Sequence, residues 1–179
     1  GVYIEAGSNH EFQNFVNCNI SHNLTGVTIS AGNIIFTGGN IVDNIEDGVH
    51  LINGSNHGHG IFNGTNISHN NRWNVWSENC VNGYTFNGCH IYGNAFGGDI
   101  FLDNSKGVVF EGGFISCPII YNYEAEGQAG YNYMRNVHFP GSYATAIKDD
   151  TGNAYPKNLI ITGATGGGLI STLNGLSIS

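Results

Sequence analysis

The sequence predicts an all-β solenoid of about seven coils, in which short strands stack along one axis. A phrase of the form Phe-x-Gly-x-x-Ile-x-x-Asn recurs, most clearly at 36–44, 62–70 and 86–94. The apolar anchors are spaced by 21, 26, 24, 24, 22 and 27 residues, at Ile20, Ile41, Ile67, Ile91, Ile115, Val137 and Ala164. Glycine makes up 28 of 179 residues, a composition that favours corners and strands over helices. Repeats of this length bury their apolar faces only by stacking on one another.

Each coil is expected to open with a short apolar strand and to continue through one copy of the phrase. Two residues of each opening strand point inward around one that points outward, because successive strand side chains alternate. The opening strands are at 2–4, 27–29, 49–51, 75–77, 100–102 and 120–122, with further coils from 147 and from 169. The phrases follow at 15–23, 36–44, 62–70, 86–94, 110–118 and 132–140, the last with Asn132 in the phenylalanine position.

Asparagine closes the phrase in four coils, at Asn23, Asn44, Asn70 and Asn94. This position suits a left-handed corner, because asparagine tolerates positive φ and its side chain can bond to the asparagine one coil away. We therefore expect a structural ladder.

The four cysteines, Cys18, Cys80, Cys89 and Cys117, are expected to be free, buried thiols. Cys18 and Cys89 hold the same slot of the repeat three coils apart. At about 4.8 Å per coil they are too distant for a disulfide. Two disulfides in a secreted protein are the alternative.

The composition also limits the partners. The net charge is -8 with only five Lys and Arg, so neither nucleic acid nor an anionic membrane would gain counterion release here. An uncharged or cationic ligand fits better. No apolar run reaches eighteen residues, so no membrane insertion is expected. Residues 1–179 are expected to form one domain, and apolar strands at both ends predict a fragment of a longer chain or a subunit.

Aligning the coils gives a first outward column that is mostly aromatic. It contains Tyr3, Thr28, His50, Trp76, Phe101 and Tyr121. Exposed rings in a row are costly unless they meet a partner, and aromatic rings pack on the apolar faces of sugars. Tyr3, His50, Trp76, Phe101 and Tyr121 are therefore candidate substrate-binding residues in a glycan groove. Burial of the column against a neighbouring subunit is the alternative.

A second outward column contains Glu5, Ser30, Ile52, Glu78, Asp103 and Tyr123. Glu78 and Asp103 fall on adjacent coils, about 4.8 Å apart at the backbone. Two carboxylates at this separation repel, so one could act as general acid and the other as base or nucleophile in glycosidic hydrolysis. These two are the candidate catalytic residues. They could instead be solvated strand-end acids, or hold a calcium ion; neither a metal nor a cofactor is predicted.

The regular coils, inward aliphatic stacks, phenylalanine column and asparagine corner resemble the right-handed, single-stranded parallel β-helix of the pectin-lyase-like superfamily. The resemblance covers essentially the whole chain. Within that group, the glycine and asparagine content, the acidity and the cysteines most resemble a bacteriophage tailspike or tail-fibre domain. This resemblance implies a homotrimer on a virion tail, outside the cell, that binds bacterial surface polysaccharide for host attachment and often cleaves it.

Two other functions remain open, since a fold alone does not define an activity. One is a non-enzymatic receptor-binding or structural module of a virion. The other is a secreted, pectinase-like glycoside hydrolase. Gly58-His59-Gly60 resembles a short polygalacturonase motif, although no Asp-Asp pair precedes it, and a glycine-rich turn that contains histidine by chance is the simpler interpretation.

Overall fold

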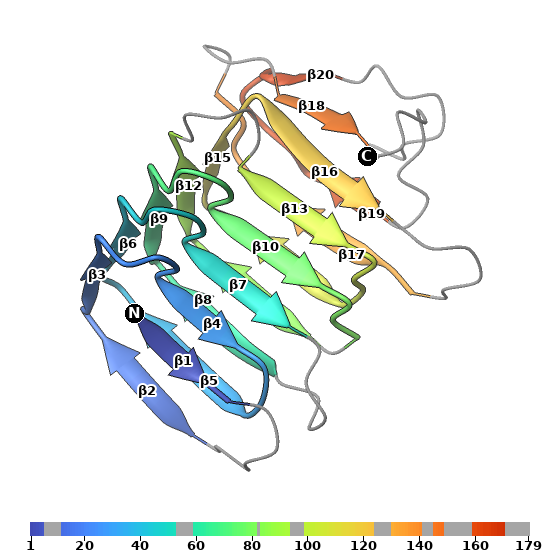
Figure 1. The fold of residues 1–179 in the computed structure, drawn as a ribbon. Helices are drawn as coiled ribbons and strands as arrows, with labels where there is room; N and C mark the ends of the chain where they lie inside the picture. Colours follow the sequence, from blue (N-terminus) through green and yellow to red (C-terminus); the bar gives the residue numbers. More distant parts are fainter. Residues whose placement is uncertain are drawn as a thin grey trace.

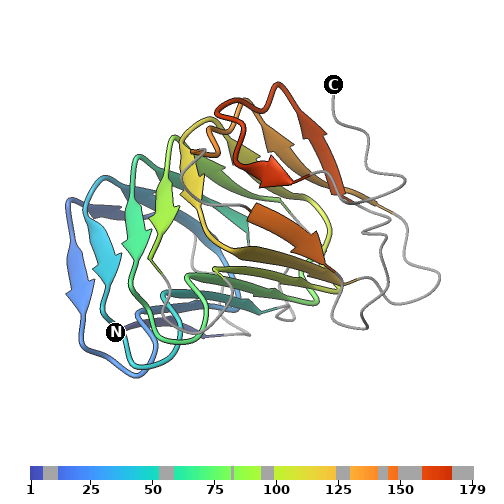
Figure 2. The same ribbon diagram turned by 90° about the horizontal axis from the view of Figure 1, so that it is seen from above.

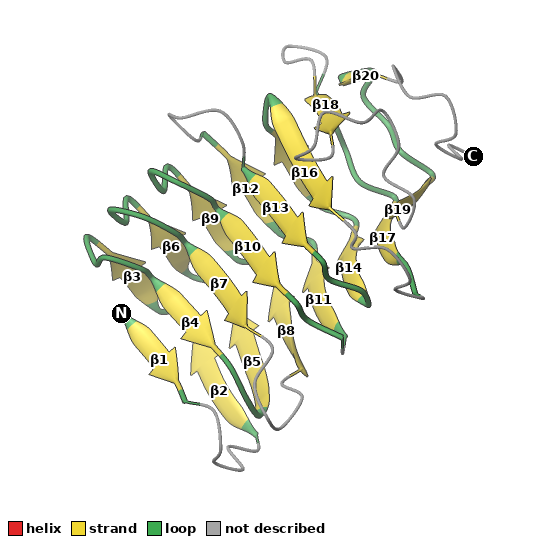
Figure 3. Cartoon of the chain, turned by 45° about the vertical axis from the view of Figure 1, so that its right-hand side comes forward, coloured by secondary structure: helices red, strands yellow, loops and turns green. Residues whose placement is uncertain are grey.

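The computed structural model describes residues 1–5, 12–52, 59–81, 83–93, 99–123, 130–140, 145–148 and 159–170. Over these residues the chain forms a parallel β-solenoid, whose successive coils each supply a strand to sheets that run along the axis (Figure 1). The coils follow one another from the N-terminal end to residue 170 (Figure 2). The described residues contain no helix (Figure 3), and hence no helix that is long and apolar enough to cross a membrane.

Three parallel sheets carry the strands. Sheet A consists of β1 (Val2–Ile4), β4 (Val27–Ile29), β7 (Val49–Ile52), β10 (Val75–Glu78), β13 (Ile100–Asp103), β16 (Ile119–Tyr123), β18 (Thr145–Lys148) and β20 (Leu169–Ile170). Sheet B consists of β2 (Gln13–Val16), β5 (Asn33–Thr37), β8 (His59–Asn63), β11 (Tyr84–Asn87), β14 (Val108–Glu111), β17 (Asn132–Arg135) and β19 (Leu159–Thr162). Sheet C consists of β3 (Asn19–Ser21), β6 (Asn40–Val42), β9 (Asn66–Ser68), β12 (His90–Tyr92) and β15 (Phe114–Ser116).

The predicted fold class is confirmed, with a small difference in the number of coils. The described chain has about five coils with a strand in all three sheets, rather than seven. The coils that open with β16 and β18 have strands in sheets A and B only. In place of a sheet C strand they have isolated bridges that connect Phe114 to His138 and His138 to Thr165.

The core consists of like residues stacked on like. Phe36, Phe62, Phe86 and Phe110 are buried in register on sheet B, and their ring centroids are 4.8 to 4.9 Å apart. On sheet C the anchors Ile41, Ile67, Ile91 and Ile115 stack in the same way, and all are buried. Neighbouring coils therefore share one continuous apolar interior, which a single coil could not form.

After Phe110 the expected register is wrong by two residues. Met134, not Asn132, pairs with Phe110 and continues the column. Asn132 is buried for a different reason, because its side chain accepts a hydrogen bond from the Val108 N–H at 3.1 Å and donates to the Ser105 carbonyl at 2.7 Å. It thus satisfies backbone groups at the corner before sheet B, which a phenylalanine could not do.

The asparagine ladder forms, although not at the expected backbone positions. Positive φ falls on the preceding residues, His22, Asp43 and His69, at 54 to 60°. The following asparagines turn inward and bond to one another, with Asn44 Nδ2 donating to Asn70 Oδ1 at 2.8 Å. Beyond Asn70 the ladder continues through Asn74, whose Nδ2 donates to the Asp99 Oδ1 at 2.6 Å. Asn94, the expected fourth member, lies outside the described residues.

The glycine of the phrase has a defined conformational role. Gly38, Gly64, Gly88 and Gly112 have φ of 59 to 64° at the corner between sheets B and C. This is the left-handed region, where a side chain is unfavourable and glycine is preferred.

All four cysteines are free, as expected. Cys80, Cys89 and Cys117 are buried, whereas Cys18 in the first coil is only partly buried. Burial raises the pKa of both the Cys80 and Cys89 thiols from an ordinary value of 9.0 to about 11. Burial also raises the pKa of Cys117. The three buried thiols are therefore protonated at neutral pH and act as small apolar core residues.

We predict that Asn70→Ala lowers the free energy of unfolding by about 3 kcal/mol or more. The substitution removes partners from Asn44, Asn74 and the Ile41 carbonyl, and all of these groups lie in the interior. Urea denaturation measures the change. The matched control is Asn87→Ala, because Asn87 bonds to Asn63 on the surface at 3.3 Å; it should cost no more than about 0.5 kcal/mol. Equal losses in the two variants would contradict a structural role for the ladder.

We predict that only Cys18 reacts rapidly with Ellman's reagent in the native protein, while all four cysteines react after unfolding. The raised thiol pKa values also make the native state less stable at alkaline pH. The unfolded thiols of Cys80 and Cys89 ionise near 9.0, but the folded ones near 11, so the free energy of unfolding should fall as the pH rises through this interval. Rapid labelling of Cys89 in the native state would contradict this assignment.

Candidate functional site

The outer face of sheet A carries the predicted aromatic column in the predicted register. Trp76 pairs with His50 on one side and with Phe101 on the other, and Phe101 pairs with Tyr121. The neighbours of these residues along each strand, such as Val75 and Ser77, point inward and are buried. The alternation of the strand thus brings side chains about 25 residues apart in sequence into one outward row.

Within this row the rings lie against one another. The His50 and Trp76 rings are stacked, with centroids 3.9 Å apart and planes 4° from parallel. The Phe101 ring is parallel to Trp76 within 7°, at 6.5 Å. Because the ring planes are parallel to each other and the rings follow one another from coil to coil, this part of the row presents mainly ring edges to solvent. Tyr121 is different, since its ring is turned by 73° from that of Phe101.

Two residues outside the predicted column, Arg72 and Trp73, complete this cluster. They precede β10 at the corner between sheets C and A. The Trp73 ring packs against Phe101 at 5.2 Å and, nearly perpendicular, against Tyr121 at 5.5 Å. The Arg72 Cζ lies 4.6 Å from the centroid of the Trp76 ring. Both residues lie in the corner and not in the repeated strand, so a comparison of equivalent strand positions does not find them. Two long side chains in the corner just before a strand are a sequence signal that could have indicated them.

A buried carboxylate holds Arg72 in place. Asp47 is completely buried, and Arg72 Nε donates to its Oδ1 at 2.9 Å while Nη2 donates to its Oδ2. Glu46 adds an ion pair at 3.5 Å. The hydrogen bond to Asp47 is the main reason that the pKa of Arg72 is raised, with smaller contributions from the charges of Asp47, Glu46 and Glu78. Three carboxylates therefore compensate this guanidinium, which makes it a poor receptor for an anionic ligand.

The predicted carboxylates border the row. Glu78 and Asp103 are register partners on β10 and β13, and both are half-buried. Glu78 also bonds across to the other neighbouring coil, where His50 Nε2 donates to its Oε2 at 3.0 Å. One imidazole thus both stacks on Trp76 and orients Glu78. His50 therefore supports the other site residues, in addition to its predicted role in substrate binding.

Three other expected positions lie apart from this cluster. Tyr3 begins the column but is separated from His50 by Thr28; it is 66% exposed. Ser30 does not face solvent as expected, because it is buried and its hydroxyl donates to the Ile4 carbonyl at 2.9 Å. His59 is the first residue of β8 on sheet B. Its neighbours His57 and Gly58 lie outside the described residues.

The cluster could contribute aromatic contact, hydrogen bonding and acid or base chemistry. In the described part of the chain, no group of three or more His, Cys, Asp or Glu side chains is placed to hold a metal ion. Comparison of the chain with protein-family models, with curated proteins and with solved structures finds no match.

We predict that Arg72→Met lowers the free energy of unfolding by about 3 kcal/mol, because it leaves the carboxylate of Asp47 buried without its partner. Asp47→Asn should cost less, since a partly exposed guanidinium can be solvated. Arg135→Met is the matched control. Arg135 also lies over an aromatic ring, with Cζ 4.4 Å from the Tyr133 centroid, but among the described residues it has no ion pair. Urea denaturation should give a loss of at most about 1 kcal/mol for this control. Similar losses for Arg72→Met and Arg135→Met would contradict the role of Asp47.

Proposed function

We propose that the outer face of sheet A binds a glycan. The observation that carries this proposal is the gathering of Trp73, Trp76, Phe101 and Tyr121 on one outward face of a regular sheet. Such rings supply the flat apolar contact that sugar rings require. The polar groups of His50, Glu78 and Asp103 lie along the same strip, within reach of the hydroxyl groups of a bound sugar.

The ring geometry suggests which residues would make the main contacts. A stacked ring whose face is covered by a neighbour offers a sugar only its edge, and this applies to the His50 side of Trp76. The Trp73 ring is tilted by 45° from the Phe101 ring and the Tyr121 ring by 73°, so neither continues the stack. We therefore assign the main sugar contact to the Trp73 and Tyr121 end of the row, while Trp76 stacks on Phe101 farther along it.

Hydrolysis of the bound glycan is the second candidate function. It is favoured by the pairing of Glu78 with Asp103 on adjacent strands, which sets their backbones about 4.8 Å apart. Carboxyl groups about 5 to 5.5 Å apart suit a retaining mechanism, and wider separations suit an inverting one. In either mechanism one carboxyl protonates the leaving oxygen. The other attacks the sugar directly or activates water.

The biological setting that we propose is a bacteriophage tailspike or tail-fibre domain, with bacterial surface polysaccharide as the ligand and a homotrimer as the assembly. The regular parallel solenoid and the acidic, glycine-rich composition support this setting. A virion module without enzymatic activity would use the same face for attachment alone. A secreted pectinase-like hydrolase would act as a monomer.

Binding is tested on immobilised bacterial surface polysaccharides with wild type, Trp73→Ala and Tyr121→Ala. Each substitution should weaken binding about tenfold, since an aromatic contact contributes about 1 kcal/mol or more. Tyr133→Ala is the matched control, because Tyr133 lies on β17 in sheet B; it should bind like wild type. Loss of binding in the control, or none in the two site variants, would reject this face as the glycan site.

Hydrolysis is tested by measuring the reducing ends released from the bound polysaccharide. Glu78→Gln and Asp103→Asn should each lower the rate about 100-fold or more while binding persists. Release at the wild-type rate by both variants would reject these carboxylates as catalytic residues. If wild type binds but releases nothing, the attachment function remains and the enzymatic one is rejected.

A further inference from the structure

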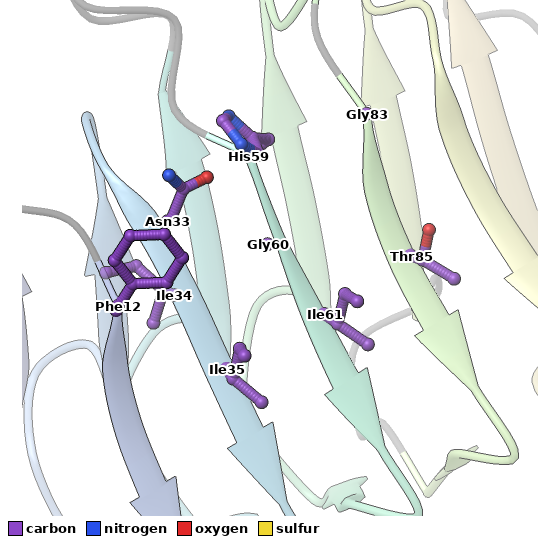
Figure 4. Close-up of a pocket in the computed structure, with 9 residues that line it drawn as sticks. All are labelled: Phe12, Asn33, Ile34, Ile35, His59, Gly60, Ile61, Gly83 and Thr85. Atoms are coloured by element: carbon purple, nitrogen blue, oxygen red, sulfur yellow. The ribbon is translucent and has the colours of Figure 1, made fainter.

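A second candidate site lies on a different face of the solenoid. The outer face of sheet B contains a groove of about 510 Å³ (Figure 4), within the size range of small-molecule sites. Its lining includes Phe12, Asn33, Ile35, His59, Ile61 and Thr85. These residues come from four successive coils, so the groove extends along the axis for three coil spacings, about 14 Å.

The groove exists because glycine occupies a position in one outward row of sheet B. Asn33 and His59 are register partners in that row, and the next position along it is Gly83, which leaves the surface open. A Cβ added at Gly83 would meet only the Gly107 carbonyl oxygen, at 3.6 Å. Beside this row, Ile35, Ile61 and Thr85 pair in register and form the floor, as their order in Figure 4 shows.

Phe12 forms an aromatic wall at one end. It is 71% exposed, so its ring is not held by burial. Its φ of 59° is unusual for a bulky residue and carries a conformational cost. In Figure 4 the ring lies beside Asn33 at the start of β5, with one face turned toward the viewer and away from the strand. An open ring of this kind contrasts with the covered ring of Trp76 on sheet A.

The remaining groups of the groove indicate the chemistry of its ligand. None of the described lining residues is Asp, Glu, Lys or Arg, although the whole chain has a net charge of -8. A charged ligand would lose hydration here without meeting an opposite formal charge among these described residues. The Asn33 amide and the Thr85 hydroxyl lie around the aliphatic floor, and each can hydrogen-bond to a ligand hydroxyl. An uncharged molecule with apolar faces and hydroxyl-bearing edges matches this arrangement.

We infer that this groove is a binding site for an uncharged saccharide, separate from the face of sheet A. One sugar ring would stack on Phe12, and the following units would lie over Ile35 and Ile61. The site depends on no residue of the sheet A cluster. Rejection of the glycan site on sheet A would therefore leave this inference unaffected.

The test is a titration of the protein with maltotriose, cellotriose and triacetylchitotriose, followed through the ¹³C-methyl signals of Ile35 and Ile61. At about 10 mM sugar, a Kd of about 1 mM is detectable. At least one trisaccharide should shift both signals in wild type. Gly83→Leu, which fills the groove at a position with room for a side chain, and Phe12→Gly, which removes the ring and suits the positive φ, should each weaken binding at least about tenfold.

Two control variants show whether the effect is specific to the groove. Thr37→Leu adds a similar apolar side chain at an exposed position of β5 outside the groove, and it should bind like wild type. Trp73→Ala should also leave the Ile35 and Ile61 shifts unchanged, whatever its effect on polysaccharide binding by sheet A. The inference is overturned if no trisaccharide shifts the two signals or if Gly83→Leu binds as well as wild type. It is also overturned if the signals move only with protein concentration, which would assign the groove to self-association.

Discussion

Hydrogen bonds between parallel strands of neighbouring coils place each side chain directly over its counterpart, and the other features of the structure depend on this stacking. It allows like residues to pack in columns, so phenylalanine meets phenylalanine and asparagine bonds to asparagine. The same register brings outward residues from distant parts of the chain together. A deletion of one residue within a strand would turn its side chains to the opposite face.

Register alone does not decide what an outward row can do. On sheet A the rings of His50 and Trp76 cover each other, so the row stabilises itself and exposes mainly edges. The corner residues Arg72 and Trp73 then change the character of the face. On sheet B, Gly83 in an outward row leaves a groove with an aliphatic floor. Small changes outside the repeated strand therefore differentiate the faces of an otherwise regular solenoid.

Electrostatics separates the two faces further. The guanidinium of Arg72 is compensated by a buried carboxylate and by its acidic neighbours, so this residue is a poor receptor for an anionic ligand. The described lining of the sheet B groove contains no formally charged side chain. Neither Arg72 nor the described lining of the groove therefore offers an anionic ligand an uncompensated positive charge, because the charge of Arg72 is compensated and the described groove lining carries none.

The sequence by itself determined the solenoid, the opening strands and most of the rows on sheet A, including the pairing of Glu78 with Asp103. Ser30 is the exception, because it is buried. These follow from periodicity and strand alternation, which are local properties of the chain. Only the tertiary structure decided the ring orientations, the hydrogen bond from His50 to Glu78 and the inward turn of the asparagines after the positive-φ residues. It also decided the placement of Met134 over Phe110, because polar Asn132 was needed to satisfy backbone groups at a corner. Such features depend on contacts between coils and on corner geometry, which a repeat in one dimension does not specify.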